Sequence, residues 1–336
     1  MTRVLVVNAG SETMKLSVVD EDERSETAEG FVAADAVGHR IVHGGERFRD
    51  PVLVDDAVEA AIEALVPLAP LHNRPAIDAL REARAALRDV PHAAVFDTAF
   101  HATIPEEAAV YAVPRNWGIR RFGFHGLSVQ WAAERVPASR LVVCHLGGGS
   151  SVTAVLDGRS VDTTMGFTPL EGVPMTTRSG TVDPGALLYL LRERGLSPHE
   201  LDHALNFDSG LAALSGTSGD VRDVERAGQP GRLALDVFAH RVAAAVAAMT
   251  VSLGGLDALV FTAGIGERAG GVRIAICKRL GFLGVHLDEG ADGRGAADAE
   301  ISAEGSNVAV WVVTAREDVV IARETRRLLA GLPPQT

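Results

Sequence analysis

The sequence predicts an α/β fold built from two related halves. Residues 4–20 (VLVVNAGSETMKLSVVD) and 141–157 (LVVCHLGGGSSVTAVLD) share one pattern at a constant offset of 137 residues. Each begins with a short β-branched run, breaks at small residues and resumes a strand that ends in Asp, which predicts a β-hairpin with a tight Gly- and Ser-containing turn. The chain of 336 residues is also longer than one hydrophobic core usually organises, so two domains are expected.

Alternating strands and helices are expected after each hairpin. In the first half, the segment 39–45 leads to helices at about 55–65 and 74–87 and to a strand at 93–96. In the second half, an Ala-rich helix at about 233–253 precedes a strand at 257–264, a helix over 273–284 and a strand at 308–313. This alternation indicates α/β architecture. We place the domains at 1–98 plus 319–336, and at 99–318.

The bulk composition narrows the classes of function. Apolar residues make up 47% of the chain and charged residues 23%, as in a soluble globular protein. The most apolar run, 243–253, is too short to span a bilayer, and the N-terminus lacks a signal-peptide pattern, so we expect a cytoplasmic protein with no membrane partner. The net charge of −12 argues against nucleic-acid binding. Cys144 and Cys277 form no CxxC pair, which favours buried thiols over a disulfide framework or a zinc site.

Polar residues cluster where the predicted strands end, which is where ligands bind in open α/β sheets. The turn 8–15 offers backbone N–H groups, hydroxyls and an ammonium that suit a phosphate, although it also fits a polar hairpin tip. Arg40 suits a carboxylate or phosphate, or a surface ion pair. Asp97 follows the strand at 93–96; it suits a nucleophile-orienting carboxylate or a magnesium ligand, or the N-cap of the next helix.

The centre of the chain carries further candidates. His125 lies in FGFHGLS with Arg120 and Arg121 just before it, which favours an anion site. The Gly-rich loop 145–151 recurs in the repeat and therefore suits phosphate better than an isolated glycine motif does. The segment 165–185 is dense in Gly, Pro, Thr and Ser, with Arg178 as its only cation, and is typical of an ordered functional segment.

Two more segments complete the set of candidates. FTAGIGER at 261–268 is a strand followed by Gly-x-Gly, which suits the floor of a nucleoside pocket. Glu317 and Asp318 begin the last predicted helix, where two carboxylates suit magnesium or simply favour the helix dipole.

Taken together, these segments resemble the acetate kinase family. The resemblance runs almost end to end, and its block from 162 to 185 is highly specific. It implies a duplicated ribonuclease-H-like fold of the actin and hexokinase type with a central cleft, a homodimer, and reversible phosphoryl transfer from ATP to acetate with Mg²⁺. The matching stretches, in the family's order, are VNAGSETMKLSV, GHRIVHGGE, PLHNRPAI, FDTAFHATIP, RRFGFHGLS, CHLGGGSSV, DTTMGFTPLEGVPMTTRSGTVDPG, SGTSGDVRDV, FTAGIGE and EDVVIARET.

The resemblance also implies roles for single residues. Arg40 and Arg178 look like the arginines that hold the carboxylate and the transferring phosphoryl group, Asp97 like the acid of the reaction centre, and His125 like the histidine that stabilises the transition state. Asn8 and Glu317 match the magnesium site. The pocket for the substrate methyl group matches Val42, Leu71, Phe124 and Pro169, next to Arg40. The ATP site matches Ser11, Thr13, Lys15, His145, Gly147, Gly148, Gly149, Asp220, Arg222, Gly264 and Gly266.

The chain departs from the family pattern at a few places. Only 31 residues separate Asn8 from Arg40, so an excursion of the first domain is missing. Gly148 replaces the usual Asn of HLGNG, Glu12 brings a negative charge to the first turn, and Val129 and Arg268 replace a His and an Asn.

Three alternatives stay open at this point. One is a propionate or butyrate kinase with the same mechanism, because one methylene in an apolar pocket discriminates only about 10- to 200-fold. The others are a non-catalytic ATP-binding homologue and a sugar kinase or chaperone-type ATPase of the same superfamily.

Overall fold

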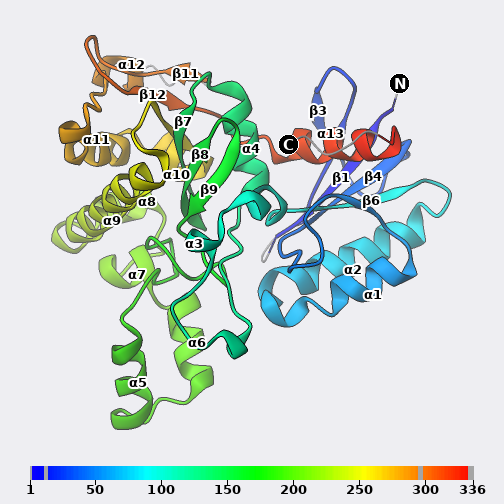
Figure 1. The fold of residues 1–336 in the computed structure, drawn as a ribbon, viewed down its shortest axis with the longest axis horizontal. Helices are drawn as coiled ribbons and strands as arrows, with labels where there is room; N and C mark the ends of the chain where they lie inside the picture. Colours follow the sequence, from blue (N-terminus) through cyan, green and yellow to red (C-terminus); the bar gives the residue numbers. More distant parts are fainter. Residues whose placement is uncertain (1, 11–13, 294–297, 332–336) are drawn as a thin grey trace. The chain divides into compact units, whose positions relative to one another are not determined.

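The structure is a computed structural model that describes residues 2–10, 14–293 and 298–331 (Figure 1). The chain divides into two compact units. Unit 1 comprises Met1–Thr103, Phe122–Trp131 and Arg316–Thr336, and unit 2 comprises Ile104–Arg121 and Ala132–Ala315. The domain limits drawn from the sequence, 1–98 plus 319–336 and 99–318, stay a prediction.

Unit 1 is a six-stranded mixed sheet with helices on both faces. Leu80 of helix α2 (Pro70–Ala86) packs with Val37 in the core of one face, where α1 (Asp56–Glu63) also lies. A Cβ on Gly38 would lie 2.7 Å from Ile321 of α13 (Glu317–Leu329), so α13 covers the opposite face. The strands lie in the order β3 (Ser25–Thr27), β2 (Met14–Val19), β1 (Val4–Ala9), β4 (Ala36–Ile41), β6 (His92–Phe96) and β5 (Val52–Leu53).

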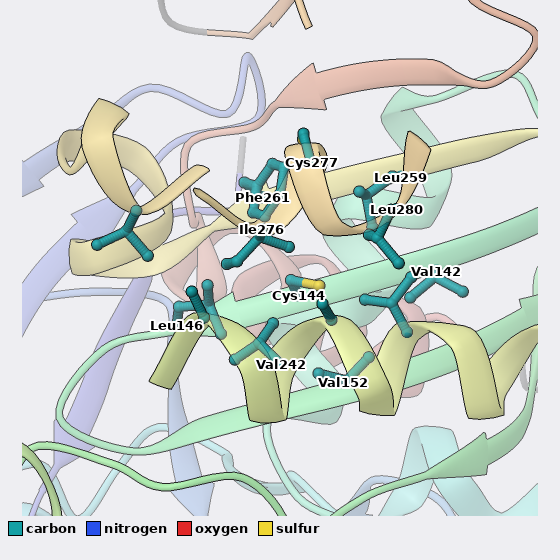
Figure 2. Packing of buried hydrophobic residues seen from close by; sticks show 14 of the residues in the cluster. Val142, Cys144, Leu146, Val152, Val242, Leu259, Phe261, Ile276, Cys277 and Leu280 are labelled. Carbon is teal, nitrogen blue, oxygen red and sulfur yellow. The ribbon is translucent and has the colours of Figure 1, made fainter. Parts of the chain in front are cut away.

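Unit 2 contains a second six-stranded sheet. Figure 2 shows its largest core, in which side chains of the sheet pack against α9 (Gln229–Leu253) and α11 (Gly270–Arg279). The strands lie in the order β9 (Arg159–Thr163), β8 (Ser150–Leu156), β7 (Arg140–Leu146), β10 (Ala258–Thr262), β12 (Ala309–Val312) and β11 (Ala299–Glu300). The other helices are α3 (Glu106–Ala109), α4 (Gly126–Arg135), α5 (Pro184–Glu193), α6 (Pro198–Phe207), α7 (Gly210–Ser215), α8 (Val221–Arg226), α10 (Ala263–Arg268) and α12 (Glu289–Gly293), with α4 shared between the units.

The two sheets have the same topology. The order β3-β2-β1-β4-β6-β5 in unit 1 matches β9-β8-β7-β10-β12-β11 in unit 2, and each pair of neighbours has the same relative direction. Asn8 pairs with Lys15 in the first hairpin, and His145 pairs with Ser151 in the second. The predicted duplication is therefore confirmed. The offset is 137 residues in the first strand but 136 in the second, because the second turn is one residue shorter.

Several predicted limits differ from the structure. Helix α2 begins at Pro70 rather than 74, because Pro in the first turn is pre-set for a helical φ and needs no N–H partner there. The strand predicted to reach 264 ends at Thr262, where Ala263 adopts φ +65° and α10 begins. The helix predicted to reach 284 ends at Arg279 and is followed by a 3₁₀ turn at Gly281–Leu283.

Helix α9 is more apolar than the sequence expectation allowed. By length and composition alone it could cross a membrane, so the expectation that no apolar run is long enough is wrong. Phe238, Val242 and Val246 of this helix are fully buried in the core of unit 2, which accounts for its composition. Cys144 and Cys277 are free thiols buried in the same core, as predicted (Figure 2).

Candidate active site

Three of the predicted site residues of unit 1 meet where its parallel strands end. Strands β1, β4 and β6 run parallel, so their carboxyl ends share one edge of the sheet. This edge brings together Asn8 near the end of β1, Arg40 near the end of β4 and Asp97 directly after β6. The Arg40 guanidinium binds the Asp97 carboxylate through two bonds, Nε to Oδ1 at 2.9 Å and Nη2 to Oδ2 at 2.5 Å. Bidentate pairing fixes the plane of the guanidinium.

Glu317, the first residue of α13, joins this cluster. Its Oε2 lies 3.4 Å from Nη1 of Arg40 and accepts a hydrogen bond of 3.2 Å from Nδ2 of Asn8. Nη1 of Arg40 also donates to Oδ1 of Asn8 at 3.1 Å. Burial alone would lower the pKa of Arg40, but the charges of Asp97 and Glu317 outweigh burial and raise it. Hydrogen bonds to Asp97 and Asn8 use three of the five guanidinium N–H donors, and Nη1 also faces Glu317.

Asp97 is buried and fixed by the segment that carries His125. Burial raises the pKa of its carboxyl group, and the Arg40 guanidinium opposes that shift. The backbone N–H of His125 bonds to the carboxylate, and the N–H of Gly126 donates to the Asp97 carbonyl at 3.0 Å. A Cβ on Gly126 would lie 2.1 Å from that carbonyl oxygen, so the approach requires glycine. His125 holds φ +61°, a strained value for histidine.

The contacts of Asp97 fit a carboxylate that orients charged groups. Its carboxylate bonds to Arg40 and to the His125 N–H group, so within the described chain it acts as the centre of a charge cluster. The alternative of an N-cap for the following helix stays a prediction.

The predicted methyl pocket is only partly assembled within unit 1. Val42 and Phe124 are buried, whereas Leu71 is 37% exposed and Pro169 belongs to unit 2. The His43 ring packs edge-on against Phe124 with ring centroids 5.4 Å apart.

Sequence reasoning missed the role of Asn73. This buried amide accepts a 3.0 Å hydrogen bond from the His43 N–H and donates one of 3.1 Å to the His43 carbonyl. These two hydrogen bonds hold the backbone next to Val42 against helix α2. The available signal was a polar residue on the helix face that otherwise buries Ala76, Ile77 and Leu80.

The first phosphate-type turn is described only in part. Lys15 lies directly opposite Asn8 in the β1–β2 register, so both side chains emerge on the same face, and Lys15 is exposed. Ser11 and Thr13, which the resemblance assigns to ATP binding, lie outside the described residues, as does Glu12.

Unit 2 contains a cavity of about 750 Å³ that fits the predicted nucleotide site. Gly147, Gly148 and Gly264 line it, together with Asp220 and Arg222. The lining excludes three other residues predicted to bind ATP, namely His145, Gly149 and Gly266. A Cβ on Gly266 would lie 3.3 Å from the Phe261 backbone, so this glycine packs α10 against the sheet.

Asp220 and Arg222 also have a local structural role. Asp220 caps α8 by accepting a 2.9 Å hydrogen bond from the Arg222 N–H, and its carboxylate pairs with the Arg222 guanidinium at 2.7 Å. Hydrogen bonds from Arg222 hold the pKa of Asp220 well below its usual range. The side chain of Arg222 is 80% exposed.

The remaining predicted residues lie in unit 2. Arg178 donates from Nη1 to the Pro169 carbonyl at 3.3 Å. Arg40, Asp97 and His125 belong to unit 1, so the predicted catalytic set divides between the units. The anion site expected at Arg120 and Arg121 is not what the structure shows for Arg121, which pairs with the Glu171 carboxylate at 3.0 Å.

The residues proposed for magnesium fit that ion by their chemistry. Asn8 and Glu317 each carry a hard oxygen donor, and Mg²⁺ is commonly held by one or two carboxylates plus water and substrate phosphates. In this structure Nδ2 of Asn8 faces Oε2 of Glu317, and Oδ1 of Asn8 accepts a hydrogen bond from Arg40. Among the described residues there is no cluster of three or more His, Cys, Asp or Glu side chains, so a cage made only of protein ligands is not the fitting mode.

Comparisons with known proteins give the family of this chain. The Acetokinase family model matches residues 33–323. The chain is 48% identical over 310 residues to the acetate kinase of Nostoc punctiforme, covering 88% of this chain and 76% of that one. It is 50% identical over 318 residues to the acetate kinase of Deinococcus radiodurans, covering 89% and 79%.

Solved structures agree as well. A propionate kinase from Francisella tularensis superposes with a TM-score of 0.89 at 34% identity, covering 96% of this chain and 99% of that one. The acetate kinase of Porphyromonas gingivalis superposes with a TM-score of 0.86 at 31% identity, covering 98% and 100%. With a family model that spans most of its length and relatives near half identity, this chain belongs to the acetokinase family.

Proposed function

We propose that this protein catalyses the reversible transfer of a phosphoryl group from ATP to acetate, giving acetyl phosphate and ADP. The observation that carries the proposal is the cluster of Arg40, Asp97, Asn8 and Glu317 at one sheet edge, in a chain that belongs to the acetokinase family. The glycine-lined cavity of unit 2 supports it as the site for the nucleotide.

The proposed chemistry needs no general base. A carboxylate is ionised at pH 7, so its oxygen attacks the γ-phosphorus directly while the bond from that phosphorus to the β-phosphate oxygen breaks. Phosphoryl transfer depends on alignment and on neutralising spread negative charge. Arg40 and Arg178 would supply the positive charge that neutralises it. Asp97 would fix the orientation of the Arg40 guanidinium, and His125 would stabilise the transition state.

Magnesium is part of the proposal. When bound, Mg²⁺ neutralises charge on the nucleotide phosphates, and Asn8 and Glu317 are the residues that would hold it. Oε2 of Glu317 lies 3.2 Å from Nδ2 of Asn8, so the two side chains are already adjacent.

Acetate is favoured over longer acids by the relatives, several of which are acetate kinases near half identity. A related structure is titled a propionate kinase, which keeps that acid as the second candidate. An apolar pocket separates acids that differ by one methylene by about 10- to 200-fold.

We further propose a cytoplasmic homodimer. Unit 2 exposes large apolar side chains on α5 to α7, including Leu188, Phe207 and Leu214, which suits a surface covered by a second copy. Sedimentation of the pure protein at micromolar concentration tests this: a single species of one chain's mass would contradict it.

The decisive experiment is acyl-phosphate formation, trapped as the hydroxamate, with ATP and magnesium and with acetate, propionate or butyrate in parallel. The proposal expects turnover that is fastest on acetate and lost when magnesium is chelated. Fastest turnover on a longer acid would keep the mechanism and change the substrate. ATP binding without turnover on any acid would overturn the proposed activity and favour a non-catalytic homologue.

A further inference from the structure

A polar cluster of unit 2 ties the loop that carries Arg178 to a distant segment of the chain. Tyr111 lies just after helix α3, and its hydroxyl donates a hydrogen bond to Oε2 of Glu171. The same hydroxyl accepts a hydrogen bond of 3.0 Å from the backbone N–H of Phe167. One phenol therefore contacts the loop 164–181 at two places.

Arg121 completes the cluster from the other end of the same segment. Its Nη2 lies 3.0 Å from Oε1 of Glu171, so both carboxylate oxygens of Glu171 are engaged. Its Nη1 donates to the carbonyls of Thr164 at 2.9 Å and Met165 at 3.1 Å. The guanidinium also lies over the Tyr111 ring, 5.7 Å from its centroid.

The cluster is compact and electrostatically consistent. Burial and the hydrogen bond to Glu171 raise the pKa of Tyr111 to about 12, so its hydroxyl remains a donor at neutral pH. A Cβ on Gly166 would lie 1.7 Å from Oε2 of Glu171 and 2.0 Å from the Tyr111 hydroxyl. Only glycine at position 166 lets these two side chains meet.

The cluster connects to Arg178 through a short path. Glu171 is two residues from Pro169, whose carbonyl accepts the 3.3 Å hydrogen bond from Nη1 of Arg178. The carbonyl of Arg178 in turn accepts a 3.0 Å hydrogen bond from the N–H of Met175, and the N–H of Thr181 donates to Gly172 at 2.9 Å. Fixing Glu171 therefore fixes the backbone group to which the guanidinium is bonded.

We propose that Tyr111, Arg121 and Glu171 form a clamp that positions Arg178 for phosphoryl transfer. The inference rests on the proposed function, because it takes Arg178 as a group that contacts the transferring phosphoryl group. The three clamp residues are positioning residues: they act through the loop and do not touch the substrates.

The clamp makes a kinetic prediction that a purely structural role does not. A displacement of about 1 Å in a catalytic group costs about 10²-fold in rate, so loosening the loop lowers kcat. The nucleotide cavity takes only Thr176 from this loop, so the KM for ATP stays within about twofold. A residue that only stabilised the fold would lower the melting temperature and leave kcat per folded molecule unchanged.

The first variant is Tyr111→Phe, which removes one hydroxyl and keeps the ring. We expect kcat to fall about 10- to 100-fold. Hydrogen exchange of residues 164–181 should become faster. The matched control is Tyr189→Phe, which alters the other of the chain's two tyrosines, half-exposed on α5. It should change neither quantity.

A double-mutant cycle identifies the path of action. If Tyr111 acts through Arg178, adding Tyr111→Phe to Arg178→Ala should lower the residual kcat by less than twofold. Gly166→Ala is an independent lesion that leaves all three clamp side chains present, and it should reproduce the loss in kcat. Gly293→Ala is its control, because a Cβ there has no atom of the described residues within 4 Å.

The outcomes separate the clamp from the proposed function. Normal kcat in Tyr111→Phe, or fully additive losses in the cycle, overturns the positioning role even if the loop exchanges faster. If the wild-type protein phosphorylates no carboxylate, the proposed function fails, and the proposed positioning of Arg178 for that reaction falls with it. In that case hydrogen exchange still shows whether Tyr111 orders the loop, which is a structural result that remains when the catalytic one is lost.

Discussion

The two sheets have one topology but different chemistry at the edge where their parallel strands end. By register, Asn8, Arg40 and Asp97 of unit 1 correspond to His145, Thr262 and Ala315 of unit 2. The first edge carries an ion-paired cluster. The second edge has Thr262 in place of the Arg, and its buried hydroxyl has no hydrogen-bond partner among the described residues. The same scaffold thus occurs twice, and only the edge of unit 1 carries the ion-paired arginine.

The cores differ in the same way. His39 and His92 of unit 1 occupy the positions of Phe261 and Val310 in unit 2. Nε2 of His39 lies 2.9 Å from Nδ1 of His92, and Nε2 of His92 lies 2.9 Å from the Leu87 carbonyl. Because a carbonyl only accepts, His92 carries its proton on Nε2 and accepts from His39. Nδ1 of His39 is then a buried acceptor without a partner.

The connections differ as well. Unit 2 inserts helices α5 to α9 between β9 and β10, and α9 covers one face of its sheet. Unit 1 joins β3 to β4 through residues 28–35, all described, with no helix. Ala28, Phe31 and Ala34 of this connection pack against its core. Asn8 and Arg40 are close in the sequence because unit 1 has no helix between β3 and β4 that corresponds to α9.

The largest expected effect tests the two sheet edges. Arg40→Lys keeps a positive charge beside Asp97 but loses the planar fork, and turnover should fall by about 10³-fold, as for arginines that stabilise phosphoryl transfer. Thr262→Val, at the corresponding position, removes a hydroxyl without a partner and should change turnover less than twofold while keeping or raising the melting temperature. Hydroxamate assays and thermal unfolding measure both. Equal damage from the two variants would refute the contrast.

The histidine pair predicts that unit 1 is the acid-sensitive half. Burial, with the neighbouring His92 and Arg84, lowers the pKa of His39 from 6.5 to about 3. The pair therefore stabilises the fold above pH 6.5, where it is neutral in both states. That stability is lost as the pH falls toward 3, because only the unfolded chain takes up the proton. Between pH 6.5 and 5 one such histidine costs about 2 kcal/mol.

Copying the core of unit 2 into unit 1 tests this sensitivity. The variant carrying His39→Phe and His92→Val should lose less unfolding free energy between pH 7 and pH 5 than the wild type, by about 2 kcal/mol or more. Urea unfolding at the two pH values measures this difference. The buried His101, whose pKa burial lowers to about 4, is common to both proteins and cancels. Identical losses would show that the pair does not cause the acid sensitivity.

The smallest expected effect concerns the second hairpin turn. Gly148 lines the cavity proposed for the nucleotide, and a Cβ there would have no described atom within 4 Å. Gly148→Asn restores the side-chain amide of the family pattern without a clash, so the dissociation constant for ATP should fall by up to about tenfold, the value of one good hydrogen bond. Calorimetric titration measures this dissociation constant. Gly293→Asn adds the same side chain away from the cavity and should leave the ATP affinity unchanged. An unchanged affinity in Gly148→Asn would show that this amide does not contribute to ATP binding.

The sequence by itself determined the elements whose information is local. The repeat predicted both hairpins, since strand, turn and strand lie within seventeen consecutive residues. Short motifs after the strands predicted Arg40 and Asp97 as candidates because the ends of parallel strands gather at one edge. The order and specificity of the motifs also gave the family.

Only the tertiary structure decided which polar groups meet. Arg40 finds Asp97 across 57 residues, and Arg121 finds Glu171 across 50. Asn73 grips the backbone of His43 from another element. Judged by residue type alone, each of these groups had several acceptable partners. A local sequence pattern does not indicate which residue, tens of positions away, will be the partner. The choice was made by folding, because a buried charge or amide is stable only beside the one partner that the packed elements bring within hydrogen-bonding distance.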